Sequence, residues 1–237
     1  MKKNRSTIAI IPARGGSKGL LKKNIKLLNG KPLIAWTIEQ ALRTKEIDEV
    51  VVSTDCPDIA AIAKDYGALV PFLRPEILSS DVATSYSVVE HCLNFYSTEL
   101  NQNFDIVAML EPTQPLREPA DLSLMCDLLV ASYDNFDAVM CVGECSQHPS
   151  LVHDIAETGY LVGYEEYASK ASRRQDLSVL YYPSGTFLIK TSELLSKKSF
   201  YPSRTAAYKL QRHQCFEIDD IYDFLAVENI MKYQWRL

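Results

Sequence analysis

The 237-residue sequence has no apolar run near the roughly 18 residues that a membrane-spanning helix needs. The apolar stretch at residues 7–13 is also too short for the hydrophobic part of a secretory signal, and it ends in a polar run from Arg14 to Lys18. We therefore expect a cytoplasmic protein with no membrane partner.

The sequence also lacks the cysteine and histidine patterns of a zinc site or a disulfide framework. Its six cysteines are spread through apolar segments with no C-x-x-C pair, and its four histidines show no metal-ligand spacing. A chain of this length can bury a sizeable core without covalent links. We expect reduced core thiols.

Acidic residues are absent from the first 38 positions, which hold nine of the 25 Lys and Arg residues. The remainder has 16 basic and 30 acidic residues, so the chain is acidic with a basic head. An acidic protein is poorly suited to nonspecific nucleic-acid binding, whereas a local basic patch can hold one nucleotide. A nonenzymatic nucleotide- or nucleic-acid-binding module remains an alternative, although Trp36 is the only aromatic residue of the basic head that could stack on a base.

The hydrophobic pattern predicts a three-layer α/β fold with a mostly parallel sheet. Several apolar runs do not alternate with polar residues, which is typical of strands covered by helices on both faces. Prolines that open helical patterns mark the starts of several helices. We predict strands at residues 7–12, 49–54, 68–72, 104–110, 137–142 and 185–190, and helices at residues 33–43, 58–66, 85–96, 119–131 and 221–233. Ligands are expected beyond the carboxyl ends of the strands.

The segment at about residues 143–182 breaks this alternation and shows no clean period. We interpret it as an insertion in a single domain of residues 1–237, one that covers the site or contacts another subunit. An irregular loop region is the alternative.

The most specific local signal is the glycine-rich and basic loop that follows the first strand. Its glycines let the backbone approach a ligand closely, and Arg14, Lys18 and Lys23 supply positive charge. The P-loop pattern is excluded because Gly19 is followed by Leu20, and the dinucleotide fingerprint is excluded because Gly15 is followed directly by a second glycine. The loop therefore predicts a site for a triphosphate.

The full loop resembles the R-G-G-S-K-G-x-x-x-K-N signature of the CMP-acylneuraminate synthetases, cytidylyltransferases that activate sialic acids and related nine-carbon sugars. The resemblance covers nearly the whole chain and continues through residues 51–55, 73–75, 80–85, 111–117 and 217–219. The R-x-x-S-x-R-L-P pattern of the related Kdo synthetases is absent. The resemblance implies a Rossmann-like nucleotidyltransferase fold, transfer of CMP from CTP to N-acetylneuraminate with release of pyrophosphate, a need for Mg²⁺, and a homodimer joined by the inserted arm.

The resemblance also implies roles for individual residues. It places the nucleotide against Ala13, Gly15, Gly16, Ser17, Lys18, Asn24, Arg74 and Ser85, and it gives catalytic roles to Arg14, Lys23 and Asp219. It assigns the metal to Glu217 and Asp219, whose i, i+2 spacing puts both carboxylates on one face of an extended segment, and the sugar to Glu111, Arg174 and Gln175. The competing interpretations are a helix N-cap for Asp219, a surface salt bridge for Arg74, a solvated loop for Arg14 and Lys23, and an exposed basic pair at residues 173–174.

Two positions depart from the family pattern. Glu111 stands where the family commonly has Gln, and Gln114 replaces a Ser in the same run. Tyr182 stands where several relatives carry Arg. A carboxylate beside an acidic sugar repels it unless the carboxylate is protonated, bound to a cation or aimed at a donor. Legionaminate, pseudaminate and Kdo therefore remain alternative acceptors.

Overall fold

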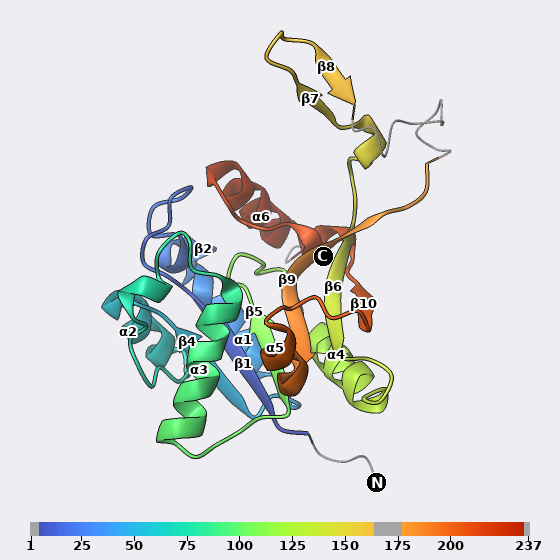
Figure 1. Cartoon of the computed structure of the whole chain (residues 1–237). Helices are drawn as coiled ribbons and strands as arrows, with labels where there is room; N and C mark the ends of the chain where they lie inside the picture. Colours follow the sequence, from blue (N-terminus) through green and yellow to red (C-terminus); the bar gives the residue numbers. More distant parts are fainter. Residues whose placement is uncertain (1–4, 164–176, 235–237) are drawn as a thin grey trace.

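A six-stranded sheet forms the centre of the protein in the computed structural model, which describes residues 5–163 and 177–234 (Figure 1). β9 runs antiparallel to both of its neighbours, while the other three strand pairs are parallel. The prediction of a mostly parallel sheet is therefore confirmed. The strand order is β10 (Thr205–Lys209), β6 (Ala138–Glu144), β9 (Tyr181–Lys190), β5 (Ile106–Leu110), β1 (Thr7–Pro12) and β4 (Glu49–Ser53).

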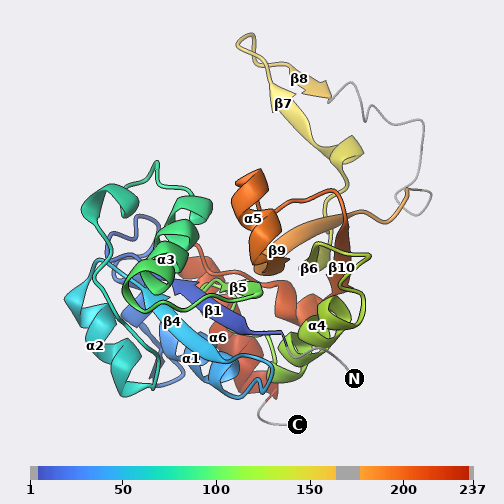
Figure 2. The ribbon, with the colours of Figure 1, turned by 60° about the horizontal axis from the view of Figure 1, so that its bottom comes forward.

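Helices cover both faces of this sheet (Figures 1 and 2). Alternate residues of β1, β4, β5, β6 and β9 are buried against the two layers. In β1, Ala9 and Ile11 face one layer, while Ile8 and Ile10 face the other. Apolar side chains on both faces explain why the strand sequence is apolar throughout. The first layer holds α1 (Leu33–Leu42), α2 (Pro57–Asp65) and α4 (Pro119–Ala131), and the second holds α3 (Ser85–Glu99) and α5 (Thr191–Lys197).

The last helix, α6 (Ile221–Gln234), closes a third apolar cluster with the start of α1. Phe224, Val227 and Met231 pack there together with Leu33. Ile218, just before the helix, is fully buried in the same cluster. This packing holds residues 217–219 beside the carboxyl ends of the strands.

The predicted strand at residues 68–72 is wrong. Only Leu69 pairs there, accepting from the Val52 amide at 2.9 Å and donating to the Val50 carbonyl at 2.8 Å. Pro71 has no amide hydrogen, so the pairing along the outer edge of β4 stops after one residue. Asn29 and Gly30 both have positive φ and form the tight turn between β2 (Leu27–Leu28) and β3 (Lys31–Pro32).

Sequence reasoning missed α5 and β10. Both are short, and β10 is an edge strand whose sequence is not strongly apolar. The described residues also form four short 3₁₀ helices, namely η1 (Lys23–Ile25), η2 (Glu76–Leu78), η3 (Pro149–Leu151) and η6 (Arg212–Cys215).

An arm leaves the sheet between β6 and β9, within the segment predicted as an insertion. It carries a hairpin of β7 (His153–Ile155) and β8 (Leu161–Gly163) that projects away from the body of the molecule (Figures 1 and 2). Residues 164–176 lie outside the described part of the chain, and with them Arg174 and Gln175. Among the described residues, no helix is both long and apolar enough to cross a bilayer.

Candidate functional site

The glycine-rich loop begins where β1 ends, at the carboxyl edge of the sheet, and is anchored to the neighbouring strand. The Ala13 amide donates to the Ser53 carbonyl at 2.9 Å, and the Gly15 amide donates to Asp55 Oδ1 at 3.0 Å. A side chain at Gly15 would put its Cβ 3.0 Å from Cys56 Cβ, which explains the glycine. These amides of Ala13 and Gly15 hold the loop in place.

The tip of the loop offers amides to a ligand. Within the described chain, the amides of Gly16, Lys18 and Gly19 donate to no protein acceptor. The Ser17 amide contacts only the Gly15 carbonyl, at 3.1 Å, and a Cβ on Gly16 would meet nothing within 4 Å. Asn24 is buried and donates from Nδ2 to the Arg14 carbonyl at 3.0 Å, so it shapes the base of this cradle. Successive exposed amides of this kind bind anions.

Two cations of the loop converge on one carboxylate. Arg14 Nη1 lies 2.9 Å from Asp81 Oδ1, and Lys18 Nζ lies 2.5 Å from Asp81 Oδ2. The hydrogen bond from Lys18, together with Arg14, lowers the pKa of the Asp81 carboxyl group. The two cations therefore point to a common centre that is able to hold an anion.

Lys23 joins the loop to the segment before α6. Its Nζ donates to the Ile218 carbonyl at 2.7 Å and lies 3.2 Å from Asp219 Oδ1. Gly19 packs against the same segment, because an added Cβ would sit 2.4 Å from the Asp219 carbonyl oxygen. The interpretation of Lys23 as a solvated loop residue is wrong.

Glu217 lies beside Asp219 and is fixed by two hydrogen bonds on one oxygen. Ser184 Oγ and the Gly185 amide donate to Glu217 Oε1 at 3.0 and 2.9 Å. Glu111 belongs to the same cluster of charges, since burial and then the charge of Glu217 raise its pKa.

Asp220, rather than Asp219, caps α6. Its Oδ1 accepts from the amides of Tyr222 and Asp223 at 2.8 and 3.0 Å. The Asp219 side chain is 84% exposed, so it is available to a ligand. The helix-cap interpretation of Asp219 is therefore wrong.

The donor set at Glu217 and Asp219 fits a magnesium ion. Mg²⁺ prefers oxygen ligands, keeps several waters and takes only one or two carboxylates when substrate phosphates supply the rest. The described residues contain no cluster of three or more His, Cys, Asp or Glu side chains that could enclose a metal. A shared site with substrate phosphate is the arrangement that these two carboxylates suit.

Arg74 lies under the loop and is buried, with only 6% of its surface exposed. Its Nε and Nη2 atoms have no hydrogen-bond partner among the described residues, and Nη2 is 3.8 Å from Asp55 Oδ1. Burial lowers its pKa. A surface salt bridge is excluded, and the unpartnered guanidinium suits a polar ligand group. Ser85 is the first residue of α3 and is exposed.

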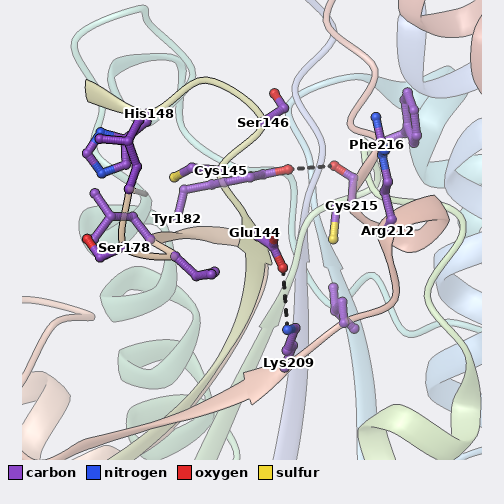
Figure 3. Close-up of a pocket in the computed structure, with 14 residues that line it drawn as sticks. Glu144, Cys145, Ser146, His148, Ser178, Tyr182, Lys209, Arg212, Cys215 and Phe216 are labelled. Carbon is purple, nitrogen blue, oxygen red and sulfur yellow. Dashed lines mark hydrogen bonds and ion pairs between the residues drawn. The ribbon is translucent and has the colours of Figure 1, made fainter. Parts of the chain in front are cut away.

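A cavity of about 590 Å³ opens at the base of the arm (Figure 3). The Tyr182 hydroxyl donates to the Cys215 carbonyl across it at 3.3 Å, and Lys209 Nζ lies 3.5 Å from Glu144 Oε2. Among the described residues, its walls come from the ends of β6, β9 and β10, from η6 and from the arm rather than from the glycine-rich loop. The cavity borders the site through Cys215 and Phe216, which directly precede Glu217 in the chain.

Sequence reasoning missed Asp81 and Ser184. Asp81 lies in a loop 67 positions from Arg14, and no local pattern relates the two residues. Ser184 stands next to Gly185, and that glycine is required because a Cβ there would meet Glu111 at 3.1 Å. The run Pro183-Ser184-Gly185 was the available signal.

The comparisons with known proteins agree with this geometry. The profile of the cytidylyltransferase family matches residues 8–234. The N-acylneuraminate cytidylyltransferase of Streptococcus agalactiae serotype V is 39% identical over 223 residues, which are 93% of this chain and 52% of that protein. The CMP-N,N'-diacetyllegionaminic acid synthase of Legionella pneumophila is 35% identical over 95% of this chain and 96% of that protein.

Solved structures support the same fold at lower identity. A CMP:2-keto-3-deoxy-manno-octonic acid synthetase in complex with CTP has a TM-score of 0.70 and 17% identity, covering 97% of this chain and 99% of that one. The chain spans about half the length of the streptococcal relative but nearly all of the Legionella protein. From the match to the family profile and the 35% identity to a full-length relative, this chain belongs to the cytidylyltransferase family.

Proposed function

We propose that the chain transfers CMP from CTP to a nonulosonic acid and releases pyrophosphate. The observation that carries the proposal is the contact of Lys23 with both the Ile218 carbonyl and Asp219. This contact brings an anion-binding loop and a carboxylate pair to one place. Attack of a sugar hydroxyl on the α-phosphorus needs both features, because charge develops on the phosphate oxygens and on the leaving group.

The loop would bind the triphosphate. Arg14 and Lys18 supply charge, and the amides of Gly16, Lys18 and Gly19 supply donors that the protein leaves unused in its described part. Lys23 is the cation nearest to the carboxylate pair, so it is placed to stabilise charge that forms near the α-phosphate. Arg74 and Ser85 would contact the nucleoside.

Glu217 and Asp219 would hold Mg²⁺ together with phosphate oxygens. The ion supplies positive charge at the phosphate oxygens when it is bound. Glu217 is held by Ser184 and Gly185, so its position does not depend on the ligand. Asp219 is exposed beside Lys23 and completes the pair.

N-acetylneuraminate is the proposed acceptor, with legionaminate, pseudaminate and Kdo as alternatives. The support is the N-acylneuraminate activity named for the streptococcal relative. The Legionella relative is named for a diacetylated acid, so the family includes more than one acceptor. Burial and then the charge of Glu217 raise the pKa of Glu111, and this direction reduces the repulsion expected between its carboxyl group and an acidic sugar. Arg174 and Gln175 are proposed to contact the sugar but lie outside the described residues.

A homodimer is proposed from the arm. The hairpin exposes apolar side chains far from the body, and exposed apolar surface of this kind is typical of an interface. The residues are Ile155, Tyr160, Leu161 and Val162, each at least 48% exposed.

Release of pyrophosphate tests the function. The purified protein is incubated with CTP, Mg²⁺ and each of four acids: N-acetylneuraminate, legionaminate, pseudaminate and Kdo. We expect pyrophosphate and a CMP-sugar with one of them, and faster release with CTP than with ATP or UTP. Absence of pyrophosphate with all four acids would overturn the proposal. The same assay compares the Lys23→Ala variant with the wild type. We expect its kcat/KM to be lower by about 100-fold or more, because the substitution removes a positive charge beside the proposed reaction centre.

A further inference from the structure

A chain of buried polar side chains connects the core to Glu217. Gln114, Thr186 and Gln214 are at most 3% exposed, and Ser184 is 1% exposed. Buried polar groups are costly unless they are paired, so this chain of hydrogen bonds specifies one arrangement.

The orientation of the Gln114 amide is fixed by its neighbours. Thr186 Oγ1 donates to Gln114 Oε1 at 2.9 Å, and Gln114 Nε2 donates to the Gln214 carbonyl at 3.3 Å. A flipped amide would put two acceptor oxygens face to face at Gln214. Nε2 therefore also points its second hydrogen at Ser184 Oγ, with which it makes a close contact.

This orientation fixes the direction of the next bond. A serine hydroxyl carries a single hydrogen, and an amide nitrogen of Gln can only donate. Because Ser184 Oγ accepts from Gln114, its own hydrogen is directed to Glu217 Oε1 at 3.0 Å. The Gly185 amide donates to the same oxygen at 2.9 Å.

Both donors contact Oε1, which leaves Oε2 of Glu217 as the oxygen that the described protein does not engage. Rotation of the carboxylate would leave the Ser184 hydroxyl without its acceptor in a buried site, and such an unpaired group is costly. Hydrogen bonds to an ionised acceptor are also stronger than neutral ones. The carboxylate is therefore held in one orientation before any ligand binds.

We infer that Gln114 and Ser184 are positioning residues that present Glu217 Oε2 to the metal and phosphate through a one-way hydrogen-bond relay. The inference rests on the proposed role of Glu217. Gln114 and Ser184 are buried, so they act through Glu217 rather than on the nucleotide. Removal of the relay should lower the affinity for the metal ion and lower kcat. CTP should still bind through the glycine-rich loop.

The test compares Ser184→Ala, Ser184→Thr and Gln114→Met with the wild type. Gln114→Met keeps the approximate shape of the side chain and removes its donor without adding charge. Thr44→Val is the matched control, since Thr44 is a buried hydroxyl that donates to the Gln40 carbonyl at 2.9 Å and is separate from the relay. The readouts are kcat, the KM for CTP, and the affinity for Mn²⁺ in the presence of CTP by electron paramagnetic resonance.

For Ser184→Ala we expect kcat and Mn²⁺ affinity to fall by about 10- to 100-fold, as is usual when a partner of a metal ligand is lost, with the KM for CTP changed less than about twofold. Ser184→Thr should retain most of the wild-type kcat and Mn²⁺ affinity, because it keeps the hydroxyl group. Gln114→Met should lose both kcat and Mn²⁺ affinity, and Thr44→Val should resemble the wild type. Should Ser184→Ala fail to fold, Gln114→Met and Ser184→Thr decide the matter.

The proposed relay would be overturned if Ser184→Ala kept the Mn²⁺ affinity and kcat of the wild type. It would also be overturned if the KM for CTP were the only parameter to change. Failure of the proposed function has a different signature. In that case the wild type releases no pyrophosphate with any acid, yet the Mn²⁺ titrations still report whether Ser184 orients Glu217.

Discussion

Lys23 Nζ lies 3.2 Å from Asp219 Oδ1, although the two residues are 196 positions apart in the chain. The first residue comes from the loop after β1 and the second from the segment that precedes α6. Burial of Ile218 between α1 and α6 holds that segment in place. The fold thus uses a core residue to set the distance between a cation and a carboxylate at the site.

Asp219 and its neighbour Asp220 are expected to have different roles, the first in catalysis and the second in the stability of α6. We expect Asp219→Asn to lose about 100-fold or more in kcat with little change in melting temperature, because its side chain faces solvent and Lys23. Asp220→Ala removes the cap of α6 and should cost about 1 kcal/mol of unfolding free energy, while kcat at low temperature is retained. Calorimetry and initial rates on both variants check this. Equal melting losses in the two variants would contradict the assignment of the cap to Asp220.

Gly19 and Gly16 provide a second matched pair. A Cβ at position 19 meets the Asp219 carbonyl at 2.4 Å, whereas one at position 16 meets nothing. Gly19→Ala should therefore cost about 1–3 kcal/mol of unfolding free energy in the absence of nucleotide, and Gly16→Ala should cost little. Gly16→Ala should instead reduce the rise in melting temperature that CTP produces, since its Cβ enters the cradle. Urea unfolding without ligand and melting curves with CTP measure the two effects.

Asp81 competes with the triphosphate for Arg14 and Lys18. Asp81→Asn removes the competing charge, so we expect the dissociation constant for CTP to fall by about two- to fivefold at low salt, with a smaller change at high salt. Titration calorimetry measures this, and Asp65→Asn makes the same charge change at an exposed position at the end of α2. Weaker binding of CTP by Asp81→Asn would show that the carboxylate assists nucleotide binding instead.

Glu111 should make stability depend on pH. Burial, then the charge of Glu217, raises its pKa above the ordinary value of 4.5, so the folded protein holds this proton more tightly than the unfolded chain. Stability is therefore lost as the pH rises from the ordinary carboxyl range through the raised pKa. Glu111→Gln lacks this loss. The unfolding free energy of the variant should therefore rise relative to that of the wild type as the pH rises through the raised pKa, and the difference should become constant at higher pH. Urea unfolding at a series of pH values checks this, and a gap that does not change with pH would contradict it.

The local parts of the site could be predicted from the sequence. The strand of residues 7–12 and the loop after it are encoded by neighbouring residues, namely an apolar run followed by glycines and cations. Prolines gave the starts of α2 and α4. Local chemistry is enough where one segment fixes its own conformation.

Long-range pairings could not be predicted in the same way. The contact of Asp81 with Arg14 joins segments 67 positions apart, and that of Ser184 with Glu217 joins segments 33 positions apart. Edge elements were also missed, since β10 has little apolar character and the expected strand at residues 68–72 is stopped by Pro71. The choice between Asp219 and Asp220 as the helix cap likewise depended on the backbone, because both residue types suit that position.

The claim that the loop of residues 13–24 forms the triphosphate cradle is tested most directly by a nuclear magnetic resonance titration. Labelled protein is titrated with CTP, and the backbone amide signals of the chain are followed. The amides of Gly16, Lys18 and Gly19 should show the largest downfield shifts, at nucleotide concentrations that also protect the protein against heat. Saturating CTP that leaves these three signals in place, or that shifts only signals elsewhere in the protein, would contradict the account.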